Sequence, residues 1–171
     1  MLILDDVSFI LHPATGSRSL KQALMKVGAD EILTHHEVCP RKAIETRACV
    51  CTIRNPYTLV ASWYQRHRRE DETFEDWLKV KLIGPRHYEG PPKLGLLYGT
   101  FWATHIIKFE NLQQDLDAVC KELKLPKLPL EHIGKNHRPV QYRRLYFAEP
   151  ATKNMVLNAY AHHIHEFQYR L

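Results

Sequence analysis

Short apolar runs alternate along the chain with segments whose apolar residues recur every third or fourth position. The apolar runs, rich in β-branched and aromatic residues, predict buried strands at residues 7–11, 31–34, 48–53 and 104–109. The segments with helical spacing predict helices at residues 19–27, 56–67, 112–123 and 155–167. Strands that alternate with helices are typical of a parallel sheet covered by helices on both faces.

The pattern therefore predicts an α/β fold, a three-layer sandwich around a central parallel sheet, in a single domain that spans residues 1–171. Segments 83–99 and 126–139 are rich in Gly and Pro and are expected to be irregular. Parallel sheets bind ligands outside the carboxyl ends of their strands. The residues that follow the predicted strands are therefore the candidates for chemistry.

Charge adds a preference for an anionic partner. The 24 Lys and Arg outnumber the 19 Asp and Glu, which gives a net charge of +5. A nucleic acid, an acidic sugar and a phosphate-rich cofactor would all suit this charge, and composition does not choose among them.

The remaining composition predicts a cytoplasmic protein that does not span a membrane. No apolar stretch approaches the roughly 18 residues of a membrane span. Asp5 and Asp6 interrupt the apolar start, so the N-terminus is not expected to be a signal peptide. The four cysteines have neither metal-ligand spacing nor the density of a disulfide framework, so we expect thiols and no metal site.

The first candidate site follows the strand predicted at residues 7–11. Residues 12–20 read HPATGSRSL and lead directly into a predicted helix. A strand, a tight turn and a helix N-terminus form an anion site, because backbone N–H groups converge there and the helix dipole adds positive charge. Gly16 would let a phosphate approach the backbone. An ordinary capped turn between a strand and a helix would share these features, so both interpretations stay open.

The second candidate site follows the strand predicted at residues 48–53. Arg54 leaves the end of this strand, and Asn55 and Pro56 begin a helix that places Ser62 about two turns further on. A guanidinium and a hydroxyl so arranged can meet the same phosphate. For either residue alone a structural role would fit equally well. The presence of both sites at strand-to-helix junctions favours a phosphate-binding function.

Both segments resemble the sulfotransferases that use 3′-phosphoadenosine-5′-phosphosulfate (PAPS). The first matches their 5′-phosphosulfate loop except at Ala14, where the family has Lys or Arg, and the second matches their 3′-phosphate motif at every defined position. Segments 108–112, 131–139 and 158–169 are also similar to parts of that family. The resemblance is greatest to the carbohydrate (Golgi-type) and 2-O-sulfotransferases, and it implies a P-loop-like sulfotransferase fold.

The resemblance implies an enzyme that passes the sulfuryl group of PAPS to a hydroxyl or amine of a carbohydrate or small molecule and releases adenosine 3′,5′-bisphosphate. It also implies which residues bind the nucleotide, namely Thr15, Gly16, Ser17, Arg18, Ser19, Arg54, Ser62, Lys135 and Arg138. The base that takes the acceptor proton is expected to be His36, then His35 and then Glu37, since a histidine with a pKa near 6.5 suits that task. Two solvated loop histidines are the alternative.

Ala14 leaves the activity open. The family's cation at this position bridges the leaving phosphate and the sulfuryl group. Its absence would suit a sulfotransferase-like nucleotide binder without catalysis, unless Arg18, Lys21, Lys135 or Arg138 replaces it, with Arg18 preferred because it lies in the same turn.

Two other classes compete with this interpretation. A nucleotide or nucleoside kinase of related architecture would need a Gly-Lys-Ser or Gly-Lys-Thr turn, which the chain lacks. A basic module for nucleic acid or another polyanion would show salt-steep affinity without a preference for PAPS. Nucleic acid is not the expected partner, and the oligomeric state is not readable from the sequence.

Overall fold

A computed structural model describes residues 1–32, 45–84, 100–131 and 142–171 of the chain, which divides into two compact units. The first unit comprises Met1–Arg54 and Leu94–Lys135, and the second comprises Asn55–Lys93 and Asn136–Leu171. The single domain expected from the sequence stays a prediction. In the described part of the chain, no helix is both long and apolar enough to cross a membrane.

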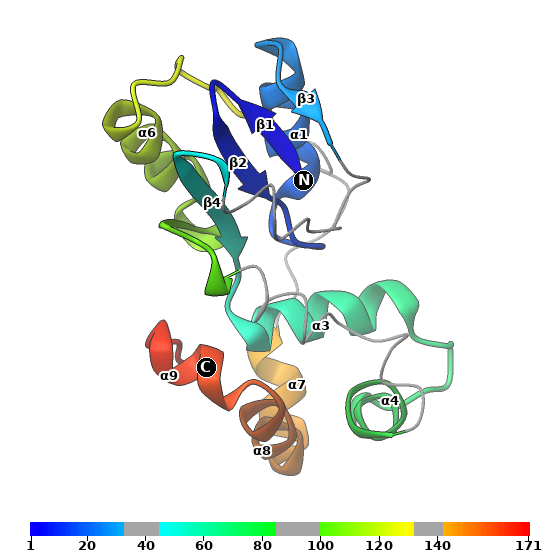
Figure 1. Cartoon of the computed structure of the whole chain (residues 1–171). Coiled ribbons are helices and arrows are strands. Elements are labelled where there is room, and N and C mark those ends of the chain that lie inside the picture. Colours follow the sequence, from blue (N-terminus) through cyan, green and yellow to red (C-terminus); the bar gives the residue numbers. More distant parts are fainter. Residues whose placement is uncertain (33–44, 85–99, 132–141) are drawn as a thin grey trace. The chain divides into compact units, whose positions relative to one another are not determined.

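The first unit is built on a five-stranded mixed sheet with the order β3-β1-β2-β4-β5. Its strands are β1 (Leu2–Leu4), β2 (Val7–Ile10), β3 (Asp30–Glu31), β4 (Ala48–Ile53) and β5 (His105–Lys108). Strands β2, β4 and β5 are parallel, whereas β1 runs antiparallel to both β2 and β3 (Figure 1). The chain is thus an α/β protein with a partly parallel sheet flanked by helices.

The prediction of an all-parallel sheet is wrong at β1. Asp5 and Asp6 reverse the chain between β1 and β2, and both have a positive φ, at 47° and 62°. Positive φ at both central residues is the pattern of a two-residue hairpin turn. The aspartates that interrupt the apolar start therefore form the tip of a hairpin, and they add an antiparallel strand that the periodicity did not predict.

Two helices cover one face of this sheet. Helices α1 (Ser17–Lys26) and α6 (Leu112–Glu122) pack their apolar residues into one core with β1, β2, β4 and β5. Leu20 and Leu24 of α1 and Leu116 of α6 are fully buried there. Helix α1 ends next to Gly28, as the sequence predicted. Gly28 has a left-handed φ of 88°, and its N–H donates to the Met25 carbonyl. The second helical layer of the predicted sandwich stays a prediction.

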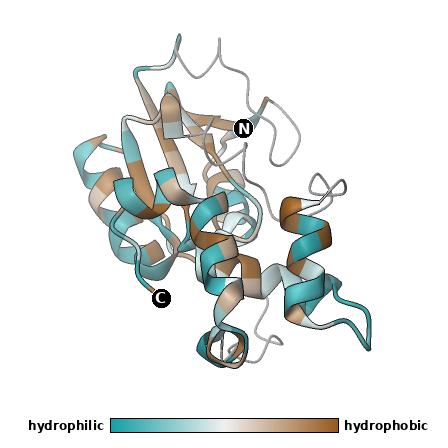
Figure 2. Cartoon of the chain, turned by 90° about the horizontal axis from the view of Figure 1, so that it is seen from below, coloured by the Kyte–Doolittle hydropathy of each residue, from teal (hydrophilic) through white to brown (hydrophobic). Residues whose placement is uncertain are grey.

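The second unit is helical in its described residues. It contains α3 (Pro56–His67), α4 (Phe74–Leu78), the π-helix η1 (Lys79–Ile83), α7 (Tyr142–Ala148), α8 (Pro150–Ala159) and α9 (Ala161–Glu166). Its helices carry both hydrophilic and hydrophobic residues, as amphipathic helices do (Figure 2). Helix α3 begins as predicted, because the Asn55 side chain accepts a hydrogen bond from the Tyr57 N–H at 3.0 Å. The single helix predicted at residues 155–167 is wrong, since Tyr160 separates α8 from α9.

Aromatic side chains hold these helices together. The ring of Tyr146 in α7 meets those of Tyr57 and Phe74 edge-on at 5.4 and 5.2 Å, and its hydroxyl donates to the Tyr57 carbonyl at 2.9 Å. Tyr64 of α3 contacts both Phe74 and Trp77. The unit therefore has an apolar core of its own, to which α3, α4 and α7 all contribute.

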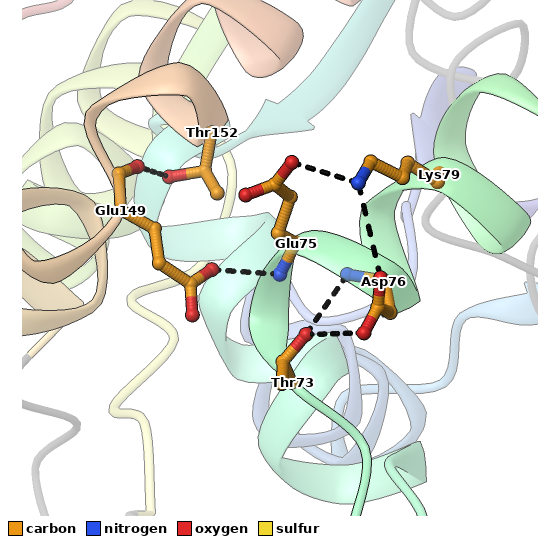
Figure 3. Close-up of polar contacts among 6 residues, drawn as sticks. All are labelled: Thr73, Glu75, Asp76, Lys79, Glu149 and Thr152. Carbon is orange, nitrogen blue, oxygen red and sulfur yellow. Dashed lines mark hydrogen bonds and ion pairs between the residues drawn. The ribbon is translucent and has the colours of Figure 1, made fainter.

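A polar network ties the start of α4 to the segment before α8 (Figure 3). Thr73 caps α4 by accepting the Asp76 N–H at 3.2 Å, while Glu149 accepts the Glu75 N–H at 2.8 Å. Lys79 lies 2.8 Å from the Glu75 carboxylate. These contacts satisfy N–H groups of the first turn, which have no partner inside a helix.

Candidate anion-binding site

The turn between β2 and α1 has the backbone form of an anion site. Ala14 and Gly16 both have left-handed φ values, at 60° and 78°, whereas Thr15 between them does not. An alternation of this kind directs successive N–H groups toward one point. Gly16 is also the N-cap of α1, where no side chain caps the helix, and the first turn of α1 contains no acidic residue. The positive end of the helix dipole therefore lies at this turn.

Gly16 is required here by two features of the fold. Its φ of 78° is one that residues with a side chain rarely adopt. A Cβ at this position would lie 2.4 Å from Leu112 Cδ2 and 3.4 Å from Phe109 Cδ2. The segment that follows β5 therefore packs directly against the turn, and the sequence did not predict this contact.

The Thr15 hydroxyl lies inside the turn, where it is fully buried. It donates to the His12 carbonyl at 2.6 Å and lies 2.6 Å from the Thr52 hydroxyl, which in turn accepts the His12 N–H at 3.2 Å. These bonds join the ends of β2 and β4. The family resemblance implies that Thr15 binds the nucleotide, whereas the structure places the Thr15 hydroxyl in the support of the turn.

The next three residues begin α1 and differ in exposure. Ser17 is buried, Arg18 is exposed and Ser19 is half-buried. All three residues belong to the first turn of α1, at the positive end of the helix dipole. This end of α1 therefore favours an anion whichever way the three side chains point.

Arg54 is brought to the same turn by the pairing of β2 with β4. The two strands are parallel neighbours, so both end at the same edge of the sheet. From there the Arg54 guanidinium donates from Nη1 to the Ala14 carbonyl at 2.9 Å, and its Cζ lies 4.3 Å from the centre of the Phe109 ring. Arg54 and the turn therefore lie at the same edge of the sheet.

The other predicted residues are not placed at this turn by the structure. Ser62 is a half-buried residue of α3 and belongs to the second unit. The Lys21 ammonium lies 2.5 Å from the Glu31 carboxylate. His35, His36, Glu37, Lys135 and Arg138 lie outside the described residues.

Thr52 and Phe109 are the supporting residues that sequence reasoning missed. Thr52 is a lone hydroxyl residue in an otherwise apolar strand, and this polarity was the signal that it has a partner. Phe109 was noted only as part of a family-like segment. Its contact with Arg54 joins residues 55 positions apart, and no local pattern predicts such a contact.

The site contains neither a reactive thiol nor a metal centre within the residues that the structure describes. Burial raises the pKa of the Cys49 thiol and raises that of Cys51 well above its usual value, so both stay protonated at neutral pH. In those same parts of the chain, no group of three or more His, Cys, Asp or Glu residues could hold a metal ion.

Comparisons with protein-family models, with curated proteins and with solved structures found no match to this chain.

Proposed function

We propose that this chain is a sulfotransferase that transfers the sulfuryl group of PAPS to a hydroxyl or amine of a carbohydrate or small molecule. The observation that carries this proposal is the convergence of Arg54 on the turn at Ala14 and Gly16, at the edge where β2 and β4 both end. This edge combines a guanidinium, backbone N–H groups and a helix N-terminus, all of which favour a phosphate or sulfate group. The resemblance of residues 12–20 and 54–64 to sulfotransferase motifs supplies the identity of the ligand.

The proposed reaction is an in-line displacement at sulfur. The acceptor oxygen or nitrogen forms a bond to sulfur while the bond between sulfur and the bridging oxygen of the 5′-phosphate breaks. The electron pair of that bond goes to the phosphate, the acceptor proton goes to a base, and the products are the sulfated acceptor and adenosine 3′,5′-bisphosphate. His36 is the proposed base, with His35 next. Donors aimed at the leaving phosphate stabilise the charge that develops there.

Binding without transfer is the second candidate function, and Ala14 favours it. The side chain at this position is a methyl group, which cannot stabilise the leaving phosphate. The turn would then hold a nucleotide through its backbone alone. A kinase function has no such support, because no Gly-Lys-Ser or Gly-Lys-Thr turn occurs in the sequence. The cytoplasmic location expected from the sequence stays a prediction.

Calorimetric titration with adenosine 3′,5′-bisphosphate, AMP and ATP tests the nucleotide site. We expect the bisphosphate to bind most tightly, with no requirement for Mg²⁺. Tightest binding of ATP with Mg²⁺ would favour a kinase, and binding of none of the three would overturn the proposal. Titration with heparin at two salt concentrations is the control for a polyanion-binding module. Release of the bisphosphate from PAPS in the presence of carbohydrate acceptors then separates transfer from binding.

A further inference from the structure

Arg54 contacts the one residue of the turn at which the expected cation is missing. Ala14 has a left-handed φ of 60° and no charged side chain. Its carbonyl accepts a hydrogen bond from Arg54 Nη1 at 2.9 Å. We propose that Arg54 supplies the positive charge that Ala14 lacks, and that it acts on the 5′-phosphosulfate rather than on the 3′-phosphate. This inference rests on the proposed function and changes the role that the sequence motif gives to Arg54.

The Phe109 ring keeps the guanidinium at the turn. Arg54 Cζ lies 4.3 Å above the ring, within the range of a cation–π contact. The same ring lies 3.4 Å from the place where a Gly16 Cβ would be. One aromatic side chain therefore supports both the turn and the cation, so Arg54 is positioned with the anion-binding N–H groups before any ligand arrives. A charge that is already in place stabilises a leaving group without further reorganisation.

Two of the cations that the sequence offered as substitutes, both in α1, are placed less well. Arg18 lies in the first turn of α1 but is exposed, whereas Lys21 is engaged with the Glu31 carboxylate. Arg54 is half-buried, and a charge with less access to water interacts more strongly with a neighbouring anion.

The test compares ligands that carry one phosphate each. AMP carries only the 5′-phosphate, adenosine 3′-monophosphate carries only the 3′-phosphate, and the bisphosphate carries both. The variants are Arg54→Met, which keeps an apolar stem beside Phe109, and the double variant Arg54→Met with Ala14→Lys, which returns a cation to the turn. Arg47→Ala is the matched control, because Arg47 also donates to backbone carbonyls, those of Asp5 and Leu123, but precedes β4 rather than following it.

We expect Arg54→Met to lower the affinities for AMP and for the bisphosphate by the same factor of about 10 to 100, because one charged hydrogen-bonded contact is lost. Affinity for adenosine 3′-monophosphate stays within about twofold of wild type, and Ala14→Lys restores part of the lost AMP affinity. Arg47→Ala changes none of the three affinities. A selective loss of affinity for adenosine 3′-monophosphate, with the affinity for AMP unchanged, would overturn the inference. A double variant that regains no affinity for AMP would overturn it as well. Circular dichroism and thermal unfolding of each variant show that it is folded before it is titrated.

The wild-type titrations separate this inference from the proposed function. If the wild type binds none of the adenosine nucleotides, the proposed function fails before any variant is made. In another outcome, the wild type prefers the bisphosphate while Arg54→Met loses only the affinity that the 3′-phosphate contributes. The proposed function then stands, and the role of Arg54 at the turn is wrong. Turnover of PAPS by the double variant, set against that of Arg54→Met, then gives the effect on transfer itself.

Discussion

Gly16 and Leu112 approach so closely that a Cβ on Gly16 would lie 2.4 Å from Leu112 Cδ2. The contact joins the N-terminus of α1 to the first residue of α6, and both helices contribute to the core on one face of the sheet. The backbone of the anion-binding turn is therefore set by packing on one side and by the hydroxyls of Thr15 and Thr52 on the other.

Gly16→Ala is expected to lower the free energy of unfolding by about 2–5 kcal/mol. A left-handed residue with a side chain costs about 1–2 kcal/mol, and the overlap with Leu112 adds about 1–3 kcal/mol of overpacking. Urea denaturation measures the loss. Gly28→Ala is the matched control, because Gly28 has a φ of 88° and no atom lies within 4 Å of the place that its Cβ would take. Equal losses in the two variants would contradict the role of Leu112.

Thr15→Val tests the buried hydroxyl pair. Valine keeps the shape of the side chain but removes the donor to the His12 carbonyl, and a buried polar group left without its partner costs about 1–3 kcal/mol. Thr15→Ser keeps the hydroxyl, so urea denaturation should show a loss of unfolding free energy below about 1.5 kcal/mol, the cost of deleting one buried methyl group. If the valine variant is as stable as wild type, the pair of hydroxyls does not support the turn.

Local signals in the sequence predicted those parts of the fold that depend on neighbouring residues. The apolar run at residues 48–53 matches β4, and Asn55 with Pro56 marks the start of α3. Gly28 marks the end of α1. Each of these predictions rests on residues within one or two turns of each other, where the side chain itself selects the backbone conformation.

Contacts between distant segments account for what the sequence did not predict. Strand β1 has only three residues, too few for a periodic pattern, and its hairpin turn uses Asp5 and Asp6 in place of the usual glycine. The stripe of apolar residues through Tyr160 continues across the break between α8 and α9, so periodicity could not show the break. At the site, the sequence placed Arg54 at the end of a strand but could not show that its guanidinium contacts Phe109.

Asn55 links the start of α3 to the C-terminal tail, and a comparison of its aspartate and alanine variants tests this link. Its Oδ1 accepts the Tyr57 N–H, while its Nδ2 donates to the Arg170 carbonyl at 2.8 Å. Asn55→Asp keeps the cap but places a carboxylate oxygen against that carbonyl, so we expect a loss of about 1 kcal/mol in unfolding free energy. Asn55→Ala loses both contacts and about 1–2 kcal/mol.

A chain that ends at Tyr169 provides the control for the aspartate variant. Without Arg170 there is no carbonyl to oppose the new carboxylate, and a negative charge at a helix N-terminus is favourable. Asn55→Asp should then be neutral or slightly stabilising in urea denaturation. The same loss in the full and the shortened chain would show that the bond to Arg170 contributes nothing.

His163 makes the stability of the second unit depend on pH. This residue is 1% exposed, and within the described part of the chain its Nε2 has no hydrogen-bond partner. Burial lowers the pKa of His163 from 6.5 to about 4, and the neighbouring His162 acts in the same direction. The ring packs beside Phe167 with centroids 5.2 Å apart. The folded chain therefore holds a neutral imidazole where the unfolded chain holds one that titrates normally.

The sign of the effect follows from proton binding. Above pH 6.5 the imidazole is neutral in both states, so its full contribution to stability is present. Between pH 6.5 and about 4 the unfolded state binds a proton that the folded state does not, and the free energy of unfolding falls. Below about pH 4 both states are protonated and the fall ends. A shift of this size corresponds to about 3 kcal/mol.

Urea denaturation of wild type and His163→Gln at about pH 7 and about pH 4.5 measures this contribution. Glutamine does not titrate, so the loss on acidification should be about 2–3 kcal/mol smaller in the variant than in wild type, while the carboxylates contribute equally to both. His165→Gln, which changes an exposed histidine of the same helix, should keep the wild-type pH dependence. If His163→Gln loses as much stability on acidification as wild type, then His163 is protonated in the folded chain, and its burial does not exclude the charge.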